Sequence, residues 1–336
     1  MASRFFSPDN SRPAVVVGQM VVVAAAYYAS ARLGLLREVV VDGAVVTPLW
    51  LPAGVALSSF LYLGLRMLPG VAAGALLSVA TISDALGPSD IAIVAGNTLA
   101  PLCSFLLLRR MGFRMELNRL RDGAALVFLG AVAGMLVSAT VGAGVLTLTG
   151  KLPHSQFWRV WLAWWAGDSL GVLVVTPLLL VLRRLRRPRS SDRWVEATVL
   201  LVTAVPLNLL ATRSSFSFLF LTFPLVIWAA LRFQLPGSAP CAALASVLAV
   251  LSATDGIGPF AGQTLFEVTA TVAAFNGAVA LTALLLAAIV TEQQNITRKI
   301  ERACGELADL VEQLTPGVEQ PRPPSAGPPP VGDSDS

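Results

Sequence analysis

Residues 158–182 read WRVWLAWWAGDSLGVLVVTPLLLVL, and their only charged side chains are Arg159 and Asp168. The arginine-rich run RRLRRPR follows directly, at residues 183–189. An apolar stretch of this length is long enough to cross the hydrocarbon core of a bilayer, about 30 Å, as a helix. Arginines gathered at one end are typical of the cytoplasmic end of such a span. The stretch therefore predicts a membrane-spanning helix whose C-terminal end lies in the cytoplasm.

The same pattern recurs through most of the chain. The 336 residues are 55% hydrophobic and 13% charged, and their mean hydropathy is +0.71. Soluble domains carry about 25% charged residues, so this composition predicts an all-α membrane protein, a bundle of about ten transmembrane helices. We expect the spans at residues 13–36, 49–65, 67–86, 90–108, 122–149, 158–182, 194–212, 216–231, 236–254 and 266–291.

The basic residues predict the orientation of this bundle. With the N-terminus in the cytoplasm, an even number of spans returns the C-terminus to the cytoplasm as well. Only five of the 24 Lys and Arg residues then lie outside: Arg32, Arg37, Lys151, Arg159 and Arg213. Because cytoplasmic loops are enriched in Lys and Arg, we expect both termini inside. The aromatic residues do not alternate with a basic stripe, so the net charge of +4 does not indicate a nucleic-acid partner.

Four segments follow from this pattern. Residues 1–12 are expected to be a cytoplasmic segment, and residues 13–291 the transmembrane domain. The first apolar run is longer than the apolar core of a signal peptide, so we expect it to stay uncleaved. Residues 292–315, where charges return, predict a cytoplasmic juxtamembrane helix. Residues 316–336 are rich in proline and are expected to be disordered.

The juxtamembrane helix carries a short seven-residue repeat. Its apolar positions recur in steps of four and three: Ile296, Ile300, Ala303, Leu307, Leu310 and Leu314. A repeat of this period is typical of a coiled coil, which here would join two copies of the chain through residues 296–314. Because the repeat is short, a lone helix is the alternative.

A weak internal repeat is also visible. Residues 66–70 (RMLPG) begin one expected span, and residues 232–237 (RFQLPG) begin another. The span after each carries an asparagine, Asn97 in the first case and Asn276 in the second. The two copies would share one orientation, as in a parallel repeat about an axis along the membrane normal. Chance similarity among small and apolar residues is the alternative.

Asp168 is the strongest candidate for a functional residue. It lies near the middle of its predicted span, where an ionisable group is costly and is a functional candidate by default. Such a carboxyl group either pairs with a donor or stays protonated. We expect a ligand contact, a proton site or a charge partner in a switch, and a structural hydrogen bond between helices is the alternative. Trp164 and Trp165 precede it and either line a pocket beside it or fill space.

Other polar residues offer less. Asn97 and Asn276 can hydrogen-bond between helices or contact a ligand. His154 is the only histidine, and the three cysteines lack the spacing of metal ligands. No Ser–His–Asp set and no phosphate-binding loop can be assembled. We therefore expect no enzymatic activity, no cofactor and no metal.

Four motifs, in their order and spacing, resemble the MASE1 family. They are residues 48–54 (PLWLPAG), 64–70 (GLRMLPG), 96–99 (GNTL) and 164–177 (WWAGDSLGVLVVTP). The resemblance covers roughly residues 14–292 and implies a sensory domain of the bacterial plasma membrane. The residues that match the family pattern are Trp50, Pro52, Gly54, Asn97, Trp164, Trp165, Asp168 and Pro177.

The family resemblance also implies an output. Such domains usually precede a cytoplasmic histidine kinase or diguanylate cyclase, but the residues after the last expected span are too few for either and carry no Gly-Gly-Asp-Glu-Phe signature. We therefore expect a sensor that detects a small ligand or a membrane state and signals to a separate kinase or cyclase through its last helix. A small-solute transporter is the alternative, because an intramembrane aspartate and a parallel repeat also fit transporters.

Overall fold

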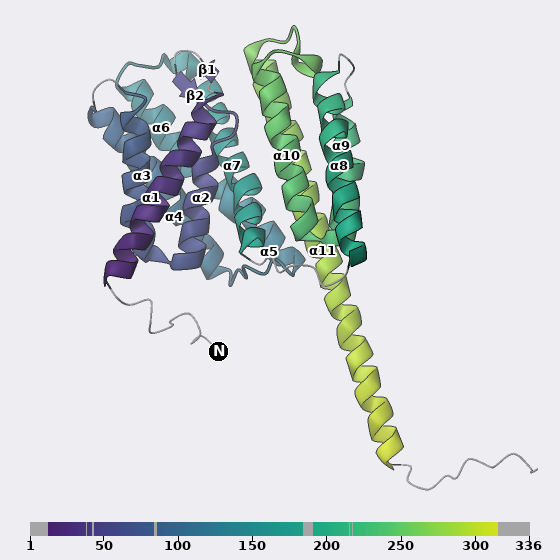
Figure 1. Ribbon diagram of the computed structural model, residues 1–336. Coiled ribbons are helices and arrows are strands. Elements are labelled where there is room, and N and C mark those ends of the chain that lie inside the picture. Colours follow the sequence, from purple (N-terminus) through teal and green to yellow (C-terminus); the bar gives the residue numbers. More distant parts are fainter. Residues whose placement is uncertain are drawn as a thin grey trace, which may run out of the picture. The chain divides into compact units, whose positions relative to one another are not determined.

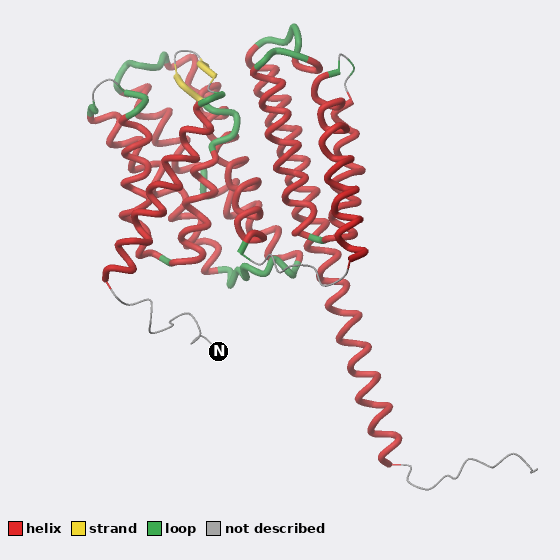
Figure 2. Tube along the Cα trace, in the orientation of Figure 1, coloured by secondary structure: helices red, strands yellow, loops and turns green. Residues whose placement is uncertain are grey.

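The computed structural model describes residues 13–314 apart from 38, 42–43, 84–85, 184–190, 215 and 217. The predicted segments 1–12 and 316–336 lie outside the described residues. The chain divides into two compact units, Met1–Glu292 and Gln293–Ser336. In the first unit, long helices run side by side, as Figures 1 and 2 show. The prediction of an all-α membrane bundle is confirmed.

Helices occupy every apolar run that was expected to cross the membrane. They are α1 (Pro13–Leu35), α2 (Leu51–Leu63), α3 (Leu68–Ala80), α4 (Pro88–Arg110), α5 (Leu120–Ala125), α6 (Leu136–Leu148), α7 (Phe157–Leu182), α8 (Ser191–Arg213), α9 (Thr222–Phe233), α10 (Leu235–Thr254) and α11 (Leu265–Leu314). By length and composition, 7 segments of the described chain can cross a membrane. Leu51–Leu63, Leu65–Ala80 and Phe218–Phe233 are apolar but shorter. The number of crossings and the orientation stay predictions.

A small β-hairpin, which the sequence did not lead us to expect, follows α1. Strands β1 (Val39–Val41) and β2 (Ala44–Val46) pair antiparallel, with Val39 opposite Val46. A signal was present, because Asp42-Gly43 lies between runs of valine, and Asp-Gly is a favoured sequence for a two-residue hairpin turn. The hairpin leads directly into the segment before α2, which forms part of the candidate site.

The chain reverses between α2 and α3 at Gly64, next to the break expected between the spans 49–65 and 67–86. Gly64 has a φ of 78°, a left-handed conformation that favours glycine. A short 3-10 helix, Leu65–Met67, then leads into α3. Pro69 lies in the first turn of α3, where a missing backbone N–H costs nothing. The proline therefore begins a helix here and does not break one.

The two copies of the suggested repeat differ in local backbone. Both proline–glycine pairs begin a helix, since Pro236 lies in the first turn of α10. In the second copy the positive-φ residue is Gln234, with φ 53°, and Arg232 precedes it within α9. In the first copy Arg66 follows the positive-φ glycine. A parallel repeat therefore stays a prediction, and the two turns do not support it.

Helices α2 and α7 pack backbone to backbone. A Cβ added at Gly54 of α2 would meet the carbonyl oxygen of Gly171 in α7, and one added at Gly171 would meet the carbonyl oxygen of Trp50. Thr176 of α7 also donates a hydrogen bond from Oγ1 to the Gly54 carbonyl oxygen at 3.3 Å. Small residues allow helices in a membrane to approach this closely. Two of the motifs quoted above, 48–54 and 164–177, therefore lie against each other.

The segment between α5 and α6 is wound as a π-helix, Leu126–Ala133. Three consecutive carbonyl oxygens in it accept hydrogen bonds from side chains of α4 and α7. The donors and acceptors are Ser104 Oγ to Gly130 (2.7 Å), Ser169 Oγ to Ala131 (3.2 Å) and Trp165 Nε1 to Val132 (2.9 Å). π-helical turns are rare and occur frequently at functional sites. Here the neighbouring helices hold the widened turn in place.

Candidate functional site

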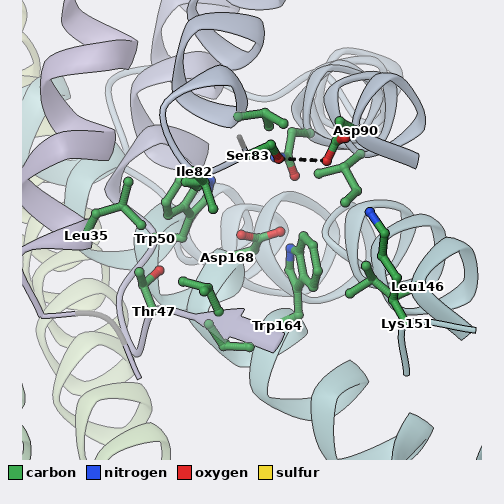
Figure 3. A pocket seen from close by; sticks show the side chains of 15 residues that line it. Leu35, Thr47, Trp50, Ile82, Ser83, Asp90, Leu146, Lys151, Trp164 and Asp168 are labelled. Atoms are coloured by element: carbon green, nitrogen blue, oxygen red, sulfur yellow. Dashed lines mark hydrogen bonds between the residues drawn. The ribbon is translucent and has the colours of Figure 1, made fainter. Parts of the chain in front are cut away.

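A cavity of about 230 Å³ opens among the hairpin, the start of α2 and one end of α1, α3, α4, α6 and α7. Figure 3 shows this cavity with Asp168 near its centre. Seven aliphatic side chains line it, together with eight that are polar or aromatic. The latter group contains Thr47, Trp50, Ser83, Asp90, Asn97, Lys151, Trp164 and Asp168. This is the usual composition of a small-molecule pocket, which is mainly apolar with a few placed polar groups.

Asp168 is the most deeply buried ionisable group in this cavity, with 2% of its surface exposed. Its Oδ2 atom accepts a hydrogen bond from the hydroxyl of Ser138 in α6. Its Oδ1 atom has no hydrogen-bond partner among the described residues. No ion pair within that part of the chain involves Asp168. One carboxyl oxygen is therefore buried beside the cavity without a hydrogen-bond partner among the described residues.

The segment before α2 places Trp50 beside Asp168. The backbone N–H of Trp50 donates to the Gly167 carbonyl oxygen at 3.0 Å. Gly167 also lies so close to Thr47 that an added Cβ would meet the Thr47 carbonyl oxygen. Because Gly167 and Gly171 have no side chains, the backbone of this segment packs directly against the backbone of α7 and runs along the helix past Asp168. Gly167 and Gly171 thus hold against α7 the segment whose Thr47 and Trp50 line the cavity.

Aromatic residues flank the carboxyl group. Trp50 and Trp164 lie on either side of Asp168 in Figure 3, and all three line the cavity. Trp164 rests on Gly142 of α6, where an added Cβ would lie 2.7 Å from the indole ring. Tyr27 of α1 is fully buried, and its hydroxyl lies close enough to Trp50 and Asp168 to interact with both. Asp168 is therefore surrounded by aromatic groups rather than by cations.

The charged groups farther along the cavity are already partnered. Asp90 accepts hydrogen bonds from the backbone N–H of Gly87 at 2.8 Å and from Ser83 Oγ at 2.9 Å. Lys151 Nζ donates to Ser89 Oγ at 2.9 Å, and its charge acts on Asp90. The free polar capacity of the cavity is therefore concentrated at Asp168 and at Asn97. The side chain of Asn97 makes no hydrogen bond to another described residue.

The structure brings four of the predicted site residues together, since Asp168, Trp164, Asn97 and Trp50 all line this cavity. Trp165 does not line it. Its indole donates to the π-helical segment and borders a second, mainly apolar cavity of about 280 Å³ between α7 and α11. Trp164 and Trp165 therefore contact different parts of the bundle, because neighbouring residues on a helix point in different directions.

The other two predicted residues lie apart from the cavity. Pro52 is buried in the first turn of α2, where a proline favours the start of a helix. Asn276 of α11 is fully buried, and neither of its side-chain polar atoms has a partner among the described residues. Neither residue lines the Asp168 cavity. The structure thus assigns Pro52 to helix initiation and leaves Asn276 as an unsatisfied amide.

Sequence reasoning missed several residues of the site. Ser138, the hydrogen-bond partner of Asp168, and Tyr27 carry hydroxyl groups within apolar runs. Other hydroxyl groups, those of Thr140 and Tyr28, lie close by in the sequence, so the sequence alone does not single out either residue. Val46 and Lys151 line the cavity from a hairpin and a loop. Nothing in their local sequence connects them to Asp168.

Within the described residues, no group of three or more His, Cys, Asp or Glu side chains is placed to hold a metal ion. The arrangement that exists is a carboxyl group, an amide and two indoles around a small cavity. Such a set can bind and orient a small molecule.

Comparison with known proteins agrees with this description. The MASE1 family model matches residues 19–294, which is most of the chain and all of the cavity. No curated protein matches the chain, and no solved structure matches it. The resemblance seen in the four motifs is confirmed. The chain therefore belongs to the MASE1 family of membrane-associated sensory domains.

Proposed function

We propose that this chain is a sensor of the bacterial plasma membrane that detects a small ligand in the Asp168 cavity. The observation that carries the proposal is a buried carboxyl group that lines a cavity and has one oxygen without a hydrogen-bond partner among the described residues. The distribution of Lys and Arg supports an orientation with this end of the bundle outside the cytoplasm and both termini inside. A ligand would then enter from the external side, and its signal would leave through α11.

One membrane span offers a connection between the cavity and the output helix. Ser138 in α6 hydrogen-bonds Asp168. At the other end of the same span, the backbone N–H of Leu120 donates to Glu292 Oε2 at 2.9 Å. Gly123 packs against Ala288, with 3.4 Å between an added Cβ and the Ala288 Cβ. Because Glu292 is the last residue of the first unit, this span contacts α11 at the end of the portion that belongs to that unit.

The π-helical segment, Leu126–Ala133, lies between these two contacts. Its widened turn can tighten to an α-helix if one residue leaves the turn, which would rotate the residues beyond it. We propose that ligand binding biases this segment between two windings. The ligand must stabilise one winding more than the other, since equal affinity for both shifts nothing.

The output would be read from the part of α11 that lies in the second unit. Of the apolar repeat there, Ile296, Ile300, Leu307 and Leu310 are more than half exposed. We propose that a second copy of the chain covers them, because a repeat with steps of four and three matches itself in a two-stranded coiled coil. A cytoplasmic histidine kinase or diguanylate cyclase would then respond to the state of this helix pair.

A spin label on Cys304 tests the proposal. Cys304 is exposed on α11, and replacing Cys103 and Cys241 by serine leaves it as the single labelling site. We expect Asp168→Asn, which keeps the shape of the side chain but removes its charge, to change the label's mobility or the distance between two labels in nanodiscs. The same substitution should have no effect in a Glu292→Gln background, because the contact with Leu120 is weakened.

The matched control is Glu301→Gln, an equivalent change at an exposed residue of the same helix. In that background the effect of Asp168→Asn should persist. Identical label spectra for the parent chain and the Asp168→Asn variant, with both proteins folded, would contradict the sensor. The transporter alternative would gain support from Asp168-dependent solute uptake into proteoliposomes together with unchanged spectra.

A further inference from the structure

We propose that the ligand of the Asp168 cavity is a small organic cation, with its ammonium group against Asp168 and its body between Trp50 and Trp164. The inference rests on the binding site of the proposed function and names the chemical class that this site selects. Charge balance, aromatic surroundings and cavity size all support this class.

Charge balance favours a cationic ligand. A charged group buried away from water is costly unless it is paired. Asp168 receives only the neutral hydroxyl of Ser138, and its Oδ1 atom has no partner among the described residues. Lys151 lines the same cavity but donates to Ser89. A cationic ligand would supply the missing counter-charge, whereas an anion would be repelled by the carboxylate and a neutral apolar molecule would leave it unpaired.

The aromatic residues favour the same class. The face of an indole ring attracts an ammonium group electrostatically. Trp50 and Trp164 flank Asp168, so a cation that contacts the carboxylate also meets indole surface (Figure 3). The buried hydroxyl of Tyr27 is a further electrostatic neighbour of Asp168. A carboxylate within an aromatic enclosure is the arrangement that recognises alkylammonium groups.

Size and wall chemistry narrow the class further. The cavity measures about 230 Å³, below the range of about 300–1,000 Å³ that is usual for ligand pockets. Val79, Ile82, Ile93 and Leu146 give it aliphatic walls. Asn97 offers an amide without a hydrogen bond to another described residue. These features suit a monovalent amine that carries a short branched chain or one ring, with a single hydroxyl or carbonyl group in reach of Asn97.

Two matched pairs of probes test the proposal by isothermal titration calorimetry on the full chain in nanodiscs. The pairs are choline with 3,3-dimethylbutan-1-ol, its neutral carbon isostere, and benzylamine with benzyl alcohol. We expect at least one cation to bind about tenfold or more tightly than its neutral partner. Asp168→Asn should remove this preference by weakening the cation alone.

Two control variants test whether the cation preference arises in the Asp168 cavity. Asp122→Asn changes another buried carboxyl group that does not line the cavity, and Trp158→Leu changes an exposed tryptophan of α7. Both should retain the cation preference, whereas Trp164→Leu should reduce it several-fold. If Asp168→Asn does not fold, as judged by its melting curve, Trp164→Leu and Trp158→Leu still form the decisive comparison.

Two results would overturn the proposal. The first is that neither cation binds more tightly than its neutral partner. The second is that the preference for the cation survives both Asp168→Asn and Trp164→Leu. Either result would exclude a cation site in this cavity. The spin label on Cys304 separates this outcome from a failure of the sensor. An Asp168-dependent label signal without cation binding would reject the ligand class alone, and cation binding without any label response would reject the sensor alone.

Discussion

The backbone N–H of Trp50 donates a hydrogen bond to the carbonyl oxygen of Gly167, with 3.0 Å between the two atoms. This bond joins the segment before α2 to the middle of α7, one residue before Asp168. One helical turn farther along α7, Gly171 faces the carbonyl oxygen of Trp50. The cavity wall therefore depends on direct contact between two backbones, and any side chain inserted there would separate them.

Gly171→Ala should destabilise the protein. An added Cβ would meet the Trp50 carbonyl oxygen, which is backbone and cannot move aside freely. Overpacking of this kind costs about 1–3 kcal/mol, and we expect a lower midpoint in detergent-induced unfolding together with weaker cation binding. Gly144→Ala in α6 is the control, because an added Cβ there meets nothing within 4 Å. Equal midpoints for the two variants would refute the close contact.

Asn276→Leu should stabilise the protein, whereas Asn208→Leu should destabilise it. Both asparagines are fully buried. Asn208 donates to the Ala204 carbonyl oxygen at 2.8 Å and accepts from Thr222 Oγ1 at 2.9 Å, but Asn276 has no partner among the described residues. An unsatisfied buried polar group costs about 1–3 kcal/mol. Unfolding midpoints of the two variants should therefore shift in opposite directions.

A loss of stability in Asn276→Leu would show that this amide does bind something in the membrane, such as an ordered water or a second chain. Asn276→Ala would then help to identify the cause, since it removes the amide without adding apolar volume. Only a hydrogen-bonded Asn276 would make both variants less stable by similar amounts.

Trp165→Phe should cost more stability than Trp161→Phe. The first change removes the hydrogen bond from Nε1 to the Val132 carbonyl oxygen of the π-helical segment, and the second removes a bond to the hydroxyl of Thr140. The two indoles stack, with 6.1 Å between ring centroids, so each variant keeps an aromatic ring in the stack. Losing an internal hydrogen bond costs about 1 kcal/mol, and more where the acceptor is left unsatisfied. Unfolding midpoints measured side by side test this order.

The orientation of the bundle predicts the sidedness of two exposed loop positions. In a chain whose native cysteines are replaced by serine, His154→Cys should react with a membrane-impermeant maleimide in intact cells. Arg114→Cys should react only after the membrane is permeabilised, because it follows the end of α4 that we predict to be cytoplasmic. The reverse pattern would place the cavity on the cytoplasmic side and would contradict the direction of signalling proposed above.

The positions of most helices were predictable because each apolar run must satisfy its own backbone hydrogen bonds in lipid. The expected spans 49–65 and 67–86 also put the turn between α2 and α3 next to Gly64. The hairpin was missed, because it depends on backbone conformation at a few residues, which hydropathy does not report. Asp168, Trp164, Asn97 and Trp50 were chosen as candidates from residue chemistry and motif resemblance, and they line one cavity. Ser138 and Lys151 were missed because their relation to Asp168 exists only across helices.

By itself, the amino-acid sequence determined that this protein is a helical membrane bundle of the MASE1 family with a buried aspartate in α7. Hydropathy along the chain settles the bundle, since lipid admits only segments that bury their own backbone polar groups. Only the tertiary structure decided that Trp164 faces the cavity while Trp165 holds the π-helical segment, and that Ser138 is the hydrogen-bond partner of Asp168. Those outcomes depend on the rotation of each helix about its axis, which close glycine contacts between neighbouring helices determine.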